Sequence, residues 1–275
     1  MRIGGDAHYY ADVSTKEDIE EAQDFAAKHN VPLIVLGGGS NTIFADTTIE
    51  ALILRLKNTE KRIEGSTVTI EAGKNLAMLV NELAEEGLDL SPLTGIPGTI
   101  GGAIIGNAGQ GPNGIWLDHY IDQVICYHEG EWKTLSKEAC NFDYRESIFK
   151  GWYASSPIVW EVVLHLPSGK PQEIKDEIER LLQIRIETQP HVKTSGSCFK
   201  AHDGVPAWKH IDAAGLRGKQ TGGVQISKKH ANFLINTGDG TFEECKSLVQ
   251  EARQSTGKPL NVEMRFIQED GSLVF

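Results

Sequence analysis

The amino-acid sequence predicts a mixed fold of α-helices and β-strands that is not a doubly wound dinucleotide-binding domain. Amphipathic helical stretches alternate with short apolar runs typical of buried strands. One such run, PLIVL, leads directly into the glycine-rich turn GGGSN at 37–41, which does not match GxGxxG. The stretch that follows, TIFADTTIEALILRL, has the pattern of a turn and a strand, whereas the doubly wound fold needs a helix there.

Composition restricts the class of protein. The 275 residues are 40% hydrophobic and 24% charged, with a net charge of −11, and the chain is long enough for two or three lobes. The acidic balance disfavours a nucleic-acid or anionic-membrane partner. The N-terminal MRIGGDAHYY has no apolar signal core, and no later run is long enough to cross a bilayer. We therefore expect a soluble, cytoplasmic protein.

The cysteines indicate neither a metal site nor a disulfide framework. Cys126, Cys140, Cys198 and Cys245 are scattered and form no CxxC pair. Such a pattern is typical of a reducing compartment, so we expect no bound metal.

The first elements have clear local signals. Residues 7–13 alternate weakly and predict a strand. Ser14 then begins S-T-K-E, which predicts a helix with a capping box and with Glu17 at position N3. The apolar face of this helix contains Ile19, Ala22 and Ala26, and its end is predicted by Asn30 and Pro32.

Two further strands and a helix are expected before the next glycine-rich stretch. The strands are 51–56 and 68–72, joined by a polar turn, and the helix is 75–87. Gly87 occupies the position of a helix-terminating glycine. The apolar face of the helix consists of Leu76, Leu79, Val80 and Leu83.

The segment at 94–109, TGIPGTIGGAIIGNAG, contains no charged side chain. Its glycines and proline argue against an ordinary helix and predict a chain of tight turns whose bare N–H groups can surround an anion. A purely structural glycine-rich loop is the alternative. Because GGGSN and this segment each lie near the end of an apolar or helical element, we prefer one pyrophosphate held by both.

The second half of the chain begins with three predicted antiparallel strands at 121–126, 131–135 and 157–166. After PSGKP at 167–171 the pattern becomes helical, so we place a lobe boundary near Ser168. The expected apolar face of that helix is Ile174, Ile178, Leu181 and Leu182.

Two more helices are predicted near the C-terminus. A short one follows Pro206 and ends at Gly215, with Trp208, Ile211 and Ala214 on its buried face. Another begins with a capping box formed by Thr241 and Glu244. Its expected core residues are Phe242, Cys245, Leu248 and Val249.

The glycine-rich motifs also carry a resemblance to a known family. GGGSN followed by GIPGTIGGAIIGNAG resembles the FAD-binding half of the UDP-N-acetylenolpyruvoylglucosamine reductases, and RIGG at 2–5 is similar to a further family element. RIGG begins at the second residue, so we expect the segment that usually precedes it to be absent. The resemblance continues in the family's order through four later motifs, YRESIFK (144–150), SGSCFK (195–200), AGLRG through KHANFLIN (214–236) and LNVEMRFI (260–267).

The resemblance implies an α+β fold. The expected architecture is a two-lobed FAD-binding domain of the vanillyl-alcohol-oxidase/PCMH type followed by an α+β substrate-binding domain. The implied ranges are 1–50 and 51–167 for the two FAD-binding lobes and 168–275 for the substrate-binding domain. The chain resembles the compact branch of the family, which lacks an extra tyrosine-bearing loop.

The implied activity is NADPH-dependent reduction of UDP-N-acetylglucosamine enolpyruvate to UDP-N-acetylmuramate through bound FAD, in peptidoglycan precursor synthesis. The partners are thus a nucleotide-sugar substrate and NADPH. No His or Cys occurs in GGGSN, which argues for non-covalent FAD. The implied cofactor-binding residues are Gly37, Gly38, Gly39, Ser40, Asn41, Gly95, Ile96, Pro97, Gly98, Thr99, Gly101, Gly102, Ala103, Asn107, Ala108 and Gly109.

Three catalytic residues follow from the same resemblance. Reducing an enolpyruvyl ether requires a hydride at one alkene carbon, a proton at the other, and stabilisation of negative charge that spreads into the carboxylate. The resemblance makes Ser197 the proton donor, Arg145 the clamp on the carboxylate and Glu263 a carboxyl group directed at the enolate.

The residues alone leave simpler interpretations open for all three. Ser197 can be a turn serine beside Gly196, and Arg145 a surface side chain paired with a neighbouring carboxylate. Glu263 can face solvent next to Arg265. We assign Lys229 and His230 to structure, because a lone His without a second ligand is weak evidence for a metal.

The sequence departs from the family pattern at two positions. Ala201 stands where the family has a substrate-binding Asn, and Thr188 where it often has a Lys. Lys193, Lys200 or His202 are the candidate replacements. Two alternative functions follow from these considerations: another flavin oxidoreductase, such as an oxidase, on the same scaffold, or a flavin-binding homologue that has lost turnover.

Overall fold

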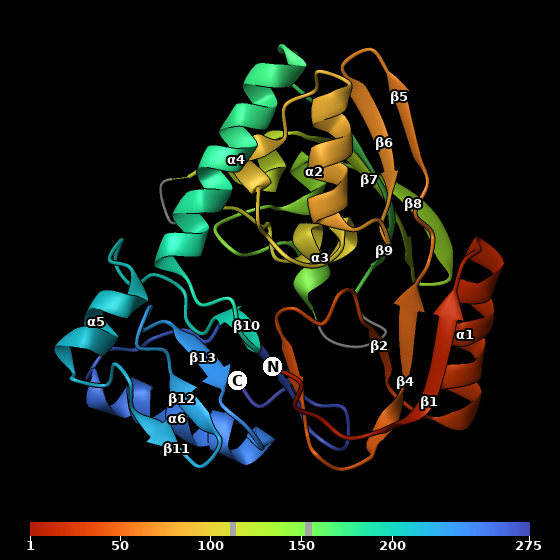
Figure 1. The fold of residues 1–275 in the computed structure, drawn as a ribbon. Helices are drawn as coiled ribbons and strands as arrows, with labels where there is room; N and C mark the ends of the chain where they lie inside the picture. The colour runs from red at the N-terminus through yellow and green to blue at the C-terminus, as the bar shows by residue number, and fades with distance from the viewer. Residues whose placement is uncertain (111–113, 152–155) are drawn as a thin grey trace. The chain divides into compact units, whose positions relative to one another are not determined.

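The computed structural model describes residues 1–110, 114–151 and 156–275, which form two compact units. The first unit contains residues 1–8, 39–51 and 185–275, and the second contains 9–38 and 52–184 (Figure 1). Both units are discontinuous in sequence, because the segment that follows the first glycine-rich turn belongs with the C-terminal part of the chain. The three-part division at 50 and 167 stays a prediction.

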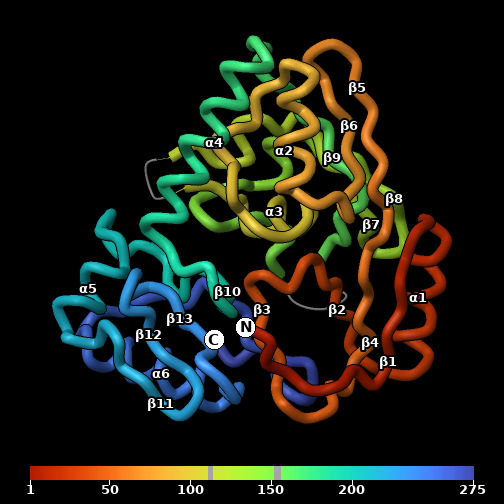
Figure 2. The backbone as a smooth tube through the Cα atoms, in the orientation of Figure 1, coloured from red at the N-terminus to blue at the C-terminus, as the bar shows by residue number. Residues whose placement is uncertain are grey.

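Runs of consecutive strands are separated by helices along the chain (Figures 1 and 2). The α-helices are α1 Lys16–His29, α2 Leu76–Glu85, α3 Ile100–Ile105, α4 Pro171–Thr188, α5 Ala207–Ala213 and α6 Phe242–Ser255. Short 3-10 helices are η1 Ser91–Leu93, η2 Leu117–His119, η3 Glu138–Cys140 and η4 Ile148–Lys150. The strands are β1 Ala7–Val13, β2 Leu33–Val35, β3 Thr42–Phe44, β4 Ile49–Leu56, β5 Lys61–Glu64, β6 Thr67–Glu71, β7 Ile121–His128, β8 Glu131–Ser136, β9 Ile158–His165, β10 Thr194–Ser197, β11 Gln220–Thr221, β12 Val224–Ile226, β13 Phe233–Asn236 and β14 Arg265–Ile267.

A three-stranded sheet of order β1-β4-β2 carries the first glycine-rich turn. β2 and β4 are parallel, with Ile34 opposite Ile53, so the chain leaves the carboxyl end of β2 directly into Gly37. Helix α1 packs its predicted apolar face into the core of this sheet, where Ile19 is fully buried. The turn is therefore anchored at its start by a buried strand.

Helix α1 begins one residue later than the sequence predicted. Its N-cap is Thr15, whose hydroxyl accepts from the Asp18 N–H at 3.1 Å. The Asp18 carboxylate accepts in return from the Thr15 N–H at 2.9 Å and from the Ser14 N–H at 2.8 Å. The predicted capping box of Ser14 and Glu17 is thus wrong in register, because Asp18 at N3 closes the box one residue later.

The second unit also contains a five-stranded antiparallel sheet of order β5-β6-β9-β7-β8. The three strands predicted at 121–126, 131–135 and 157–166 are confirmed as β7, β8 and β9. The expected polar turn between 56 and 68 contains an additional strand, β5, which alternates half-buried and exposed residues at the edge of the sheet.

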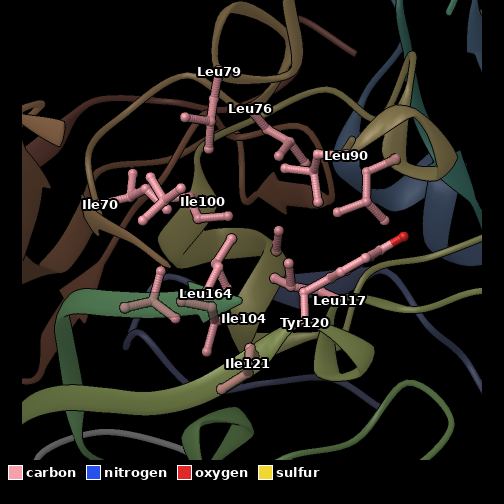
Figure 3. Close-up of a cluster of buried hydrophobic side chains, with 14 of the residues drawn as sticks. Ile70, Leu76, Leu79, Leu90, Ile100, Ile104, Leu117, Tyr120, Ile121 and Leu164 are labelled. Atoms are coloured by element: carbon pink, nitrogen blue, oxygen red, sulfur yellow. The ribbon is translucent and has the colours of Figure 1, made fainter. Parts of the chain in front are cut away.

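A large hydrophobic core lies between this sheet and the helices α2, α3 and the first part of α4. Figure 1 shows these helices on the same side of the sheet. Figure 3 shows Ile100 and Ile104 of α3 among side chains from α2 and from the sheet, including Leu79 and Leu164. The side chains of Ile100 and Ile104 are fully buried, so α3 is fixed by packing.

The expectation that 94–109 contains only turns is wrong, because α3 forms within it. Thr99 caps the helix by accepting from the Gly102 N–H at 3.3 Å. Gly101 lets the helix approach the sheet, since a Cβ on it would lie 2.9 Å from the Ala72 Cβ. Burial of one apolar face therefore overrides the poor helix propensity of the two glycines.

The first unit is built on a four-stranded antiparallel sheet of order β10-β13-β12-β11. A parallel pair, β3 with β14, lies in the same unit. The capping box of Thr241 and Glu244 is confirmed at the start of α6. The four apolar residues predicted for α6 are all buried in the core of this unit.

Helix α4 confirms its predicted apolar face only in part. Ile174 and Ile178 are buried, whereas the Leu182 side chain is 42% exposed. Within the described residues, no helix has the length and apolar character needed to span a membrane.

The shifted helix cap gives a first testable prediction. We expect Thr15→Ala to lower the free energy of unfolding by about 1 kcal/mol, because it removes the acceptor for the Asp18 N–H. Ser14→Ala is the matched control, since the Ser14 contribution comes from its backbone N–H. Chemical denaturation measures both variants, and a larger loss for Ser14→Ala would contradict the observed register.

Candidate functional site

The two glycine-rich bends touch each other within the second unit. A Cβ on Gly38 would lie 2.7 Å from the Gly98 Cα, and a Cβ on Gly37 would lie 2.8 Å from the Thr99 Oγ1. Such distances leave no room for a side chain at either position. The expectation that the bends at 37–39 and 98–102 converge is therefore confirmed, while what they bind stays a prediction.

Backbone N–H groups gather at this contact. The amide that precedes the first bend, of Leu36, donates to Leu54 O at 2.8 Å, and the Ile100 amide donates to Lys74 O at 2.9 Å. Gly37 and Gly38 follow Leu36, and Gly98 and Thr99 precede Ile100. In the described part of the chain, the N–H groups of these four residues have no acceptor. Gly38 is exposed at the surface, so an anion has access to these donors.

Several residues of the second segment face the protein interior. Gly101 donates its N–H to Ala72 O at 2.9 Å, and Ala103 is buried in the hydrophobic core. Asn107 is fully buried, and its side-chain Nδ2 donates to Asp143 O at 3.0 Å. These three residues shape the segment, whereas its exposed part is at Pro97 and Gly102.

The other predicted cofactor-binding residues fall into two groups. Gly95, Ile96, Ala108 and Gly109 lie in the same segment of the second unit, and Gly95 has a φ of 73°. Gly39, Ser40 and Asn41 belong to the first unit. The unit boundary thus falls inside the GGGSN turn.

Arg145 lies in the second unit beside the end of the second glycine-rich segment. Its Nη1 donates to Asn107 O at 3.3 Å, and its Nη2 donates to Gly109 O at 2.6 Å. Two carbonyl acceptors define the orientation of the planar guanidinium. The sequence did not predict this contact, because residues 107–109 and 145 are joined only by the tertiary fold.

Ser197 and Glu263 lie on neighbouring backbone segments of the first unit. Ser197 ends β10, directly after Gly196, whose φ of 76° bends the strand. The residue that follows, Cys198, accepts at its carbonyl oxygen from the Glu263 N–H at 2.8 Å. The structure therefore brings together two of the three predicted catalytic residues within one unit, and it places Arg145 in the other.

Asn41 supports the same group of residues. Its Nδ2 donates to Glu263 O at 3.1 Å, and its own carbonyl oxygen accepts from the Arg265 N–H at 3.0 Å. The parallel pairing of β3 with β14, with Thr42 opposite Arg265, produces this arrangement. The last residue of GGGSN thus holds the backbone that carries the predicted catalytic carboxyl group.

A second asparagine fixes the segment that follows Ser197. Asn232 Oδ1 accepts from the Phe199 N–H at 3.0 Å, while Asn232 Nδ2 donates to Phe199 O at 2.8 Å. Asn232 is buried, and its carbonyl oxygen accepts from the Cys198 N–H at 2.8 Å. Asn232 therefore has a structural role in fixing the segment after Ser197.

Two ionisable groups beside this segment, Cys198 and His230, are shifted towards their neutral forms by burial. Burial raises the pKa of the Cys198 thiol, which keeps it protonated. Burial is also the main cause that lowers the pKa of His230, whose Nδ1 accepts from the Asn232 N–H at 3.3 Å. The structural assignment of His230 is thereby supported, and in the described residues no group of His, Cys, Asp and Glu could hold a metal ion.

Lys229 lies near the position where the family pattern has a lysine. Its Nζ donates to Ile186 O at 2.5 Å, at the C-terminal end of α4 and two residues before Thr188. The sequence analysis expected a structural role for Lys229, and this hydrogen bond gives it a helix-capping role. Lys193, Lys200 and His202, the expected replacements for the missing contacts, lie in the same unit.

Family models match both halves of the chain. A model described as an FAD binding domain matches residues 7–131. A model described as the C-terminal domain of UDP-N-acetylenolpyruvoylglucosamine reductase matches residues 187–267. The first match contains both glycine-rich bends, and the second contains Ser197 and Glu263.

Relatives of known name match nearly the whole chain. UDP-N-acetylenolpyruvoylglucosamine reductase of Aquifex aeolicus is 35% identical over 284 residues, which cover 99% of this chain and 93% of that protein. The enzyme of the same name from Chlamydia pneumoniae is 35% identical over 97% of this chain and 88% of its own length. The crystal structure of the reductase from Thermus caldophilus superimposes with a TM-score of 0.81 at 30% identity, covering 94% of this chain and 91% of that one. With 35% identity to two of these relatives over nearly all of its own length and 88–93% of theirs, this chain belongs to the UDP-N-acetylenolpyruvoylglucosamine reductase family.

Proposed function

We propose that this protein reduces UDP-N-acetylglucosamine enolpyruvate to UDP-N-acetylmuramate, with bound FAD and with NADPH as the reductant, in peptidoglycan precursor synthesis. The observation that carries the proposal is the contact between the two glycine bends, which lies within the match to the FAD-binding model. Membership of the reductase family, with relatives named for this activity, supports the choice of substrate.

The residues at the bends fit the diphosphate of FAD. The N–H groups of Gly37, Gly38, Gly98 and Thr99 are donors without a described protein acceptor, and three of the four residues carry no side chain that would shield them. Backbone amides arranged in this way bind anionic oxygens without the need for a cationic side chain. We propose that these four amides hold the diphosphate. When bound, FAD supplies the hydride that it has received from NADPH.

Ser197 has the role of proton donor in this proposal. As hydride adds to one alkene carbon of the enolpyruvyl group, the second alkene carbon must gain a proton. We propose that the Ser197 hydroxyl supplies this proton. A serine hydroxyl is a weak acid, so its position must be well defined for the transfer to occur. The bonds that Asn232 makes to Phe199 and Cys198 support this, because they fix the backbone directly after Ser197.

Arg145 and Glu263 stabilise charge on the substrate. Hydride addition leaves negative charge that is delocalised into the substrate carboxylate. We propose that the Arg145 guanidinium binds this carboxylate. The carbonyl oxygens of Asn107 and Gly109 set the plane of the guanidinium. Glu263 is assigned a hydrogen bond to the enolate-like oxygen, and its backbone is held by Cys198 and Asn41.

An absorption experiment tests the activity itself. Purified protein should show a flavin band that NADPH bleaches and that the enolpyruvyl nucleotide sugar restores under anaerobic conditions. Fast reoxidation by oxygen with no response to the nucleotide sugar would instead identify an oxidase. A flavin band that neither NADPH nor the nucleotide sugar alters would identify a binding protein without turnover.

The contact between the bends gives a second prediction. Gly38→Ala should weaken FAD binding about 10-fold or more, because the added Cβ would lie 2.7 Å from the Gly98 Cα and must push the bends apart. Gly106→Ala is the matched control in the second segment, since a Cβ there meets nothing within 4 Å. Flavin fluorescence titration measures both variants. Equal FAD affinities for the two would contradict the proposed cradle.

The proton-donor assignment gives a third prediction. Ser197→Ala should bind FAD and accept electrons from NADPH at the normal rate, while reoxidation by the nucleotide sugar falls by about 10²-fold or more. Ser195→Ala is the matched control, because Ser195 is buried two residues away and its hydroxyl has no hydrogen-bond partner in the described part of the chain. Stopped-flow spectroscopy separates the two half-reactions. Near-normal reoxidation of Ser197→Ala would remove this residue from the role.

A further inference from the structure

The turn that carries Arg145 is attached to the end of the second glycine-rich segment. This turn, residues 143–147, is far from the segment in sequence, yet four side-chain hydrogen bonds join the two. They are Asn107 Nδ2 to Asp143 O at 3.0 Å, Arg145 Nη1 to Asn107 O at 3.3 Å, Arg145 Nη2 to Gly109 O at 2.6 Å and Ser147 Oγ to Ile105 O at 2.8 Å.

Asn107 is the centre of this attachment. Its side chain is fully buried and uses both ends, because Oδ1 accepts from the Asp118 N–H at 3.0 Å while Nδ2 donates to Asp143. Its carbonyl oxygen accepts from Arg145. A φ of 38° explains why the position suits asparagine, which adopts the left-handed region more readily than most residues. The same residue therefore binds the turn through its amide and the guanidinium through its backbone.

The turn itself is held in a conformation that needs support. Arg145 has a φ of 59°, which is uncommon for a residue with a long side chain. Reciprocal hydrogen bonds of 3.1 Å between Asp143 and Glu146 close the turn, and Lys150 Nζ donates to Arg145 O at 2.8 Å. A strained backbone conformation persists where several surrounding contacts hold it in place, and such conformations are frequent at functional sites.

We propose that Asn107 is a positioning residue for Arg145 rather than a residue that contacts FAD. The proposal rests on the proposed role of Arg145 at the substrate carboxylate. Asn107 fixes the backbone of the turn at Asp143 through its side chain and one edge of the guanidinium through its carbonyl oxygen, so removing the side chain loosens the turn that carries Arg145. The residue then acts in the step that consumes the nucleotide sugar, and the step that consumes NADPH does not depend on it.

The experiment uses full-length protein loaded with FAD. Asn107→Gly keeps the left-handed backbone and removes the amide, and Asn141→Gly is the matched control, because Asn141 is exposed and has a φ of 46°. We expect Asn107→Gly to slow reoxidation by the nucleotide sugar about 10-fold, the scale typical of lost supporting contacts, while reduction by NADPH stays within about twofold. In an Arg145→Ala background the same substitution should cause no further loss.

A second readout needs neither substrate nor turnover. Hydrogen exchange of the Glu146 amide, which donates to Asp143 O, should be faster in Asn107→Gly than in Asn141→Gly. If wild-type protein is not reoxidised by the nucleotide sugar, the proposed function fails, and hydrogen exchange still decides whether Asn107 orders the turn. Should Asn107→Gly not fold, Ser147→Ala removes another of the four bonds and is judged by the same criteria.

Three results would overturn the proposal. One is equal exchange at Glu146 in the two asparagine variants. Another is a multiplicative loss when Asn107→Gly is combined with Arg145→Ala, since independent residues add their effects in free energy. The third is weakened FAD binding with normal reoxidation in the loaded fraction, which would make Asn107 a cofactor contact.

Discussion

The close approach of two backbone bends is the constraint on which the rest of this structure depends. Gly38 and Gly98 come so near that a Cβ on Gly38 would lie 2.7 Å from the Gly98 Cα. Each bend is anchored by buried secondary structure: β2 precedes the first, and α3, with Ile100 and Ile104 in the core, follows the second. The amides that flank the two bends, those of Leu36 and Ile100, are paired within the protein.

The same two segments also organise the predicted catalytic residues. The end of the second segment holds the Arg145 turn through its carbonyl oxygens, and Asn41, the last residue of the first turn, holds the backbone of Glu263. Hydrogen bonds of this kind between distant segments give a physical reason for the family's motifs to occur together. Each motif supplies backbone acceptors or donors that another motif requires.

Three asparagine side chains in this protein make the same kind of structural contact. Asn41, Asn107 and Asn232 each use a side-chain amide to pair backbone groups of a segment that is remote in sequence. An amide is suited to this task because it both donates and accepts and carries no charge that burial would penalise. The sequence suggested cofactor binding for Asn41 and Asn107, and it did not show these backbone contacts.

The sequence by itself determined the order of most helices and strands, the two glycine-rich turns and the identity of the family motifs, because periodicity, capping and glycine content are local properties. It did not predict α3, whose glycines disfavour a helix until Ile100 and Ile104 are buried and Gly101 packs on Ala72. It also missed the one-residue shift at Thr15, because the usual capping-box pattern has Glu or Gln at N3, whereas Asp18 has that position here. Only the tertiary structure decided that Gly38 meets Gly98, that Glu263 lies beside Cys198 and that Asn107 supports Arg145, because contacts between distant segments are set by how whole elements pack.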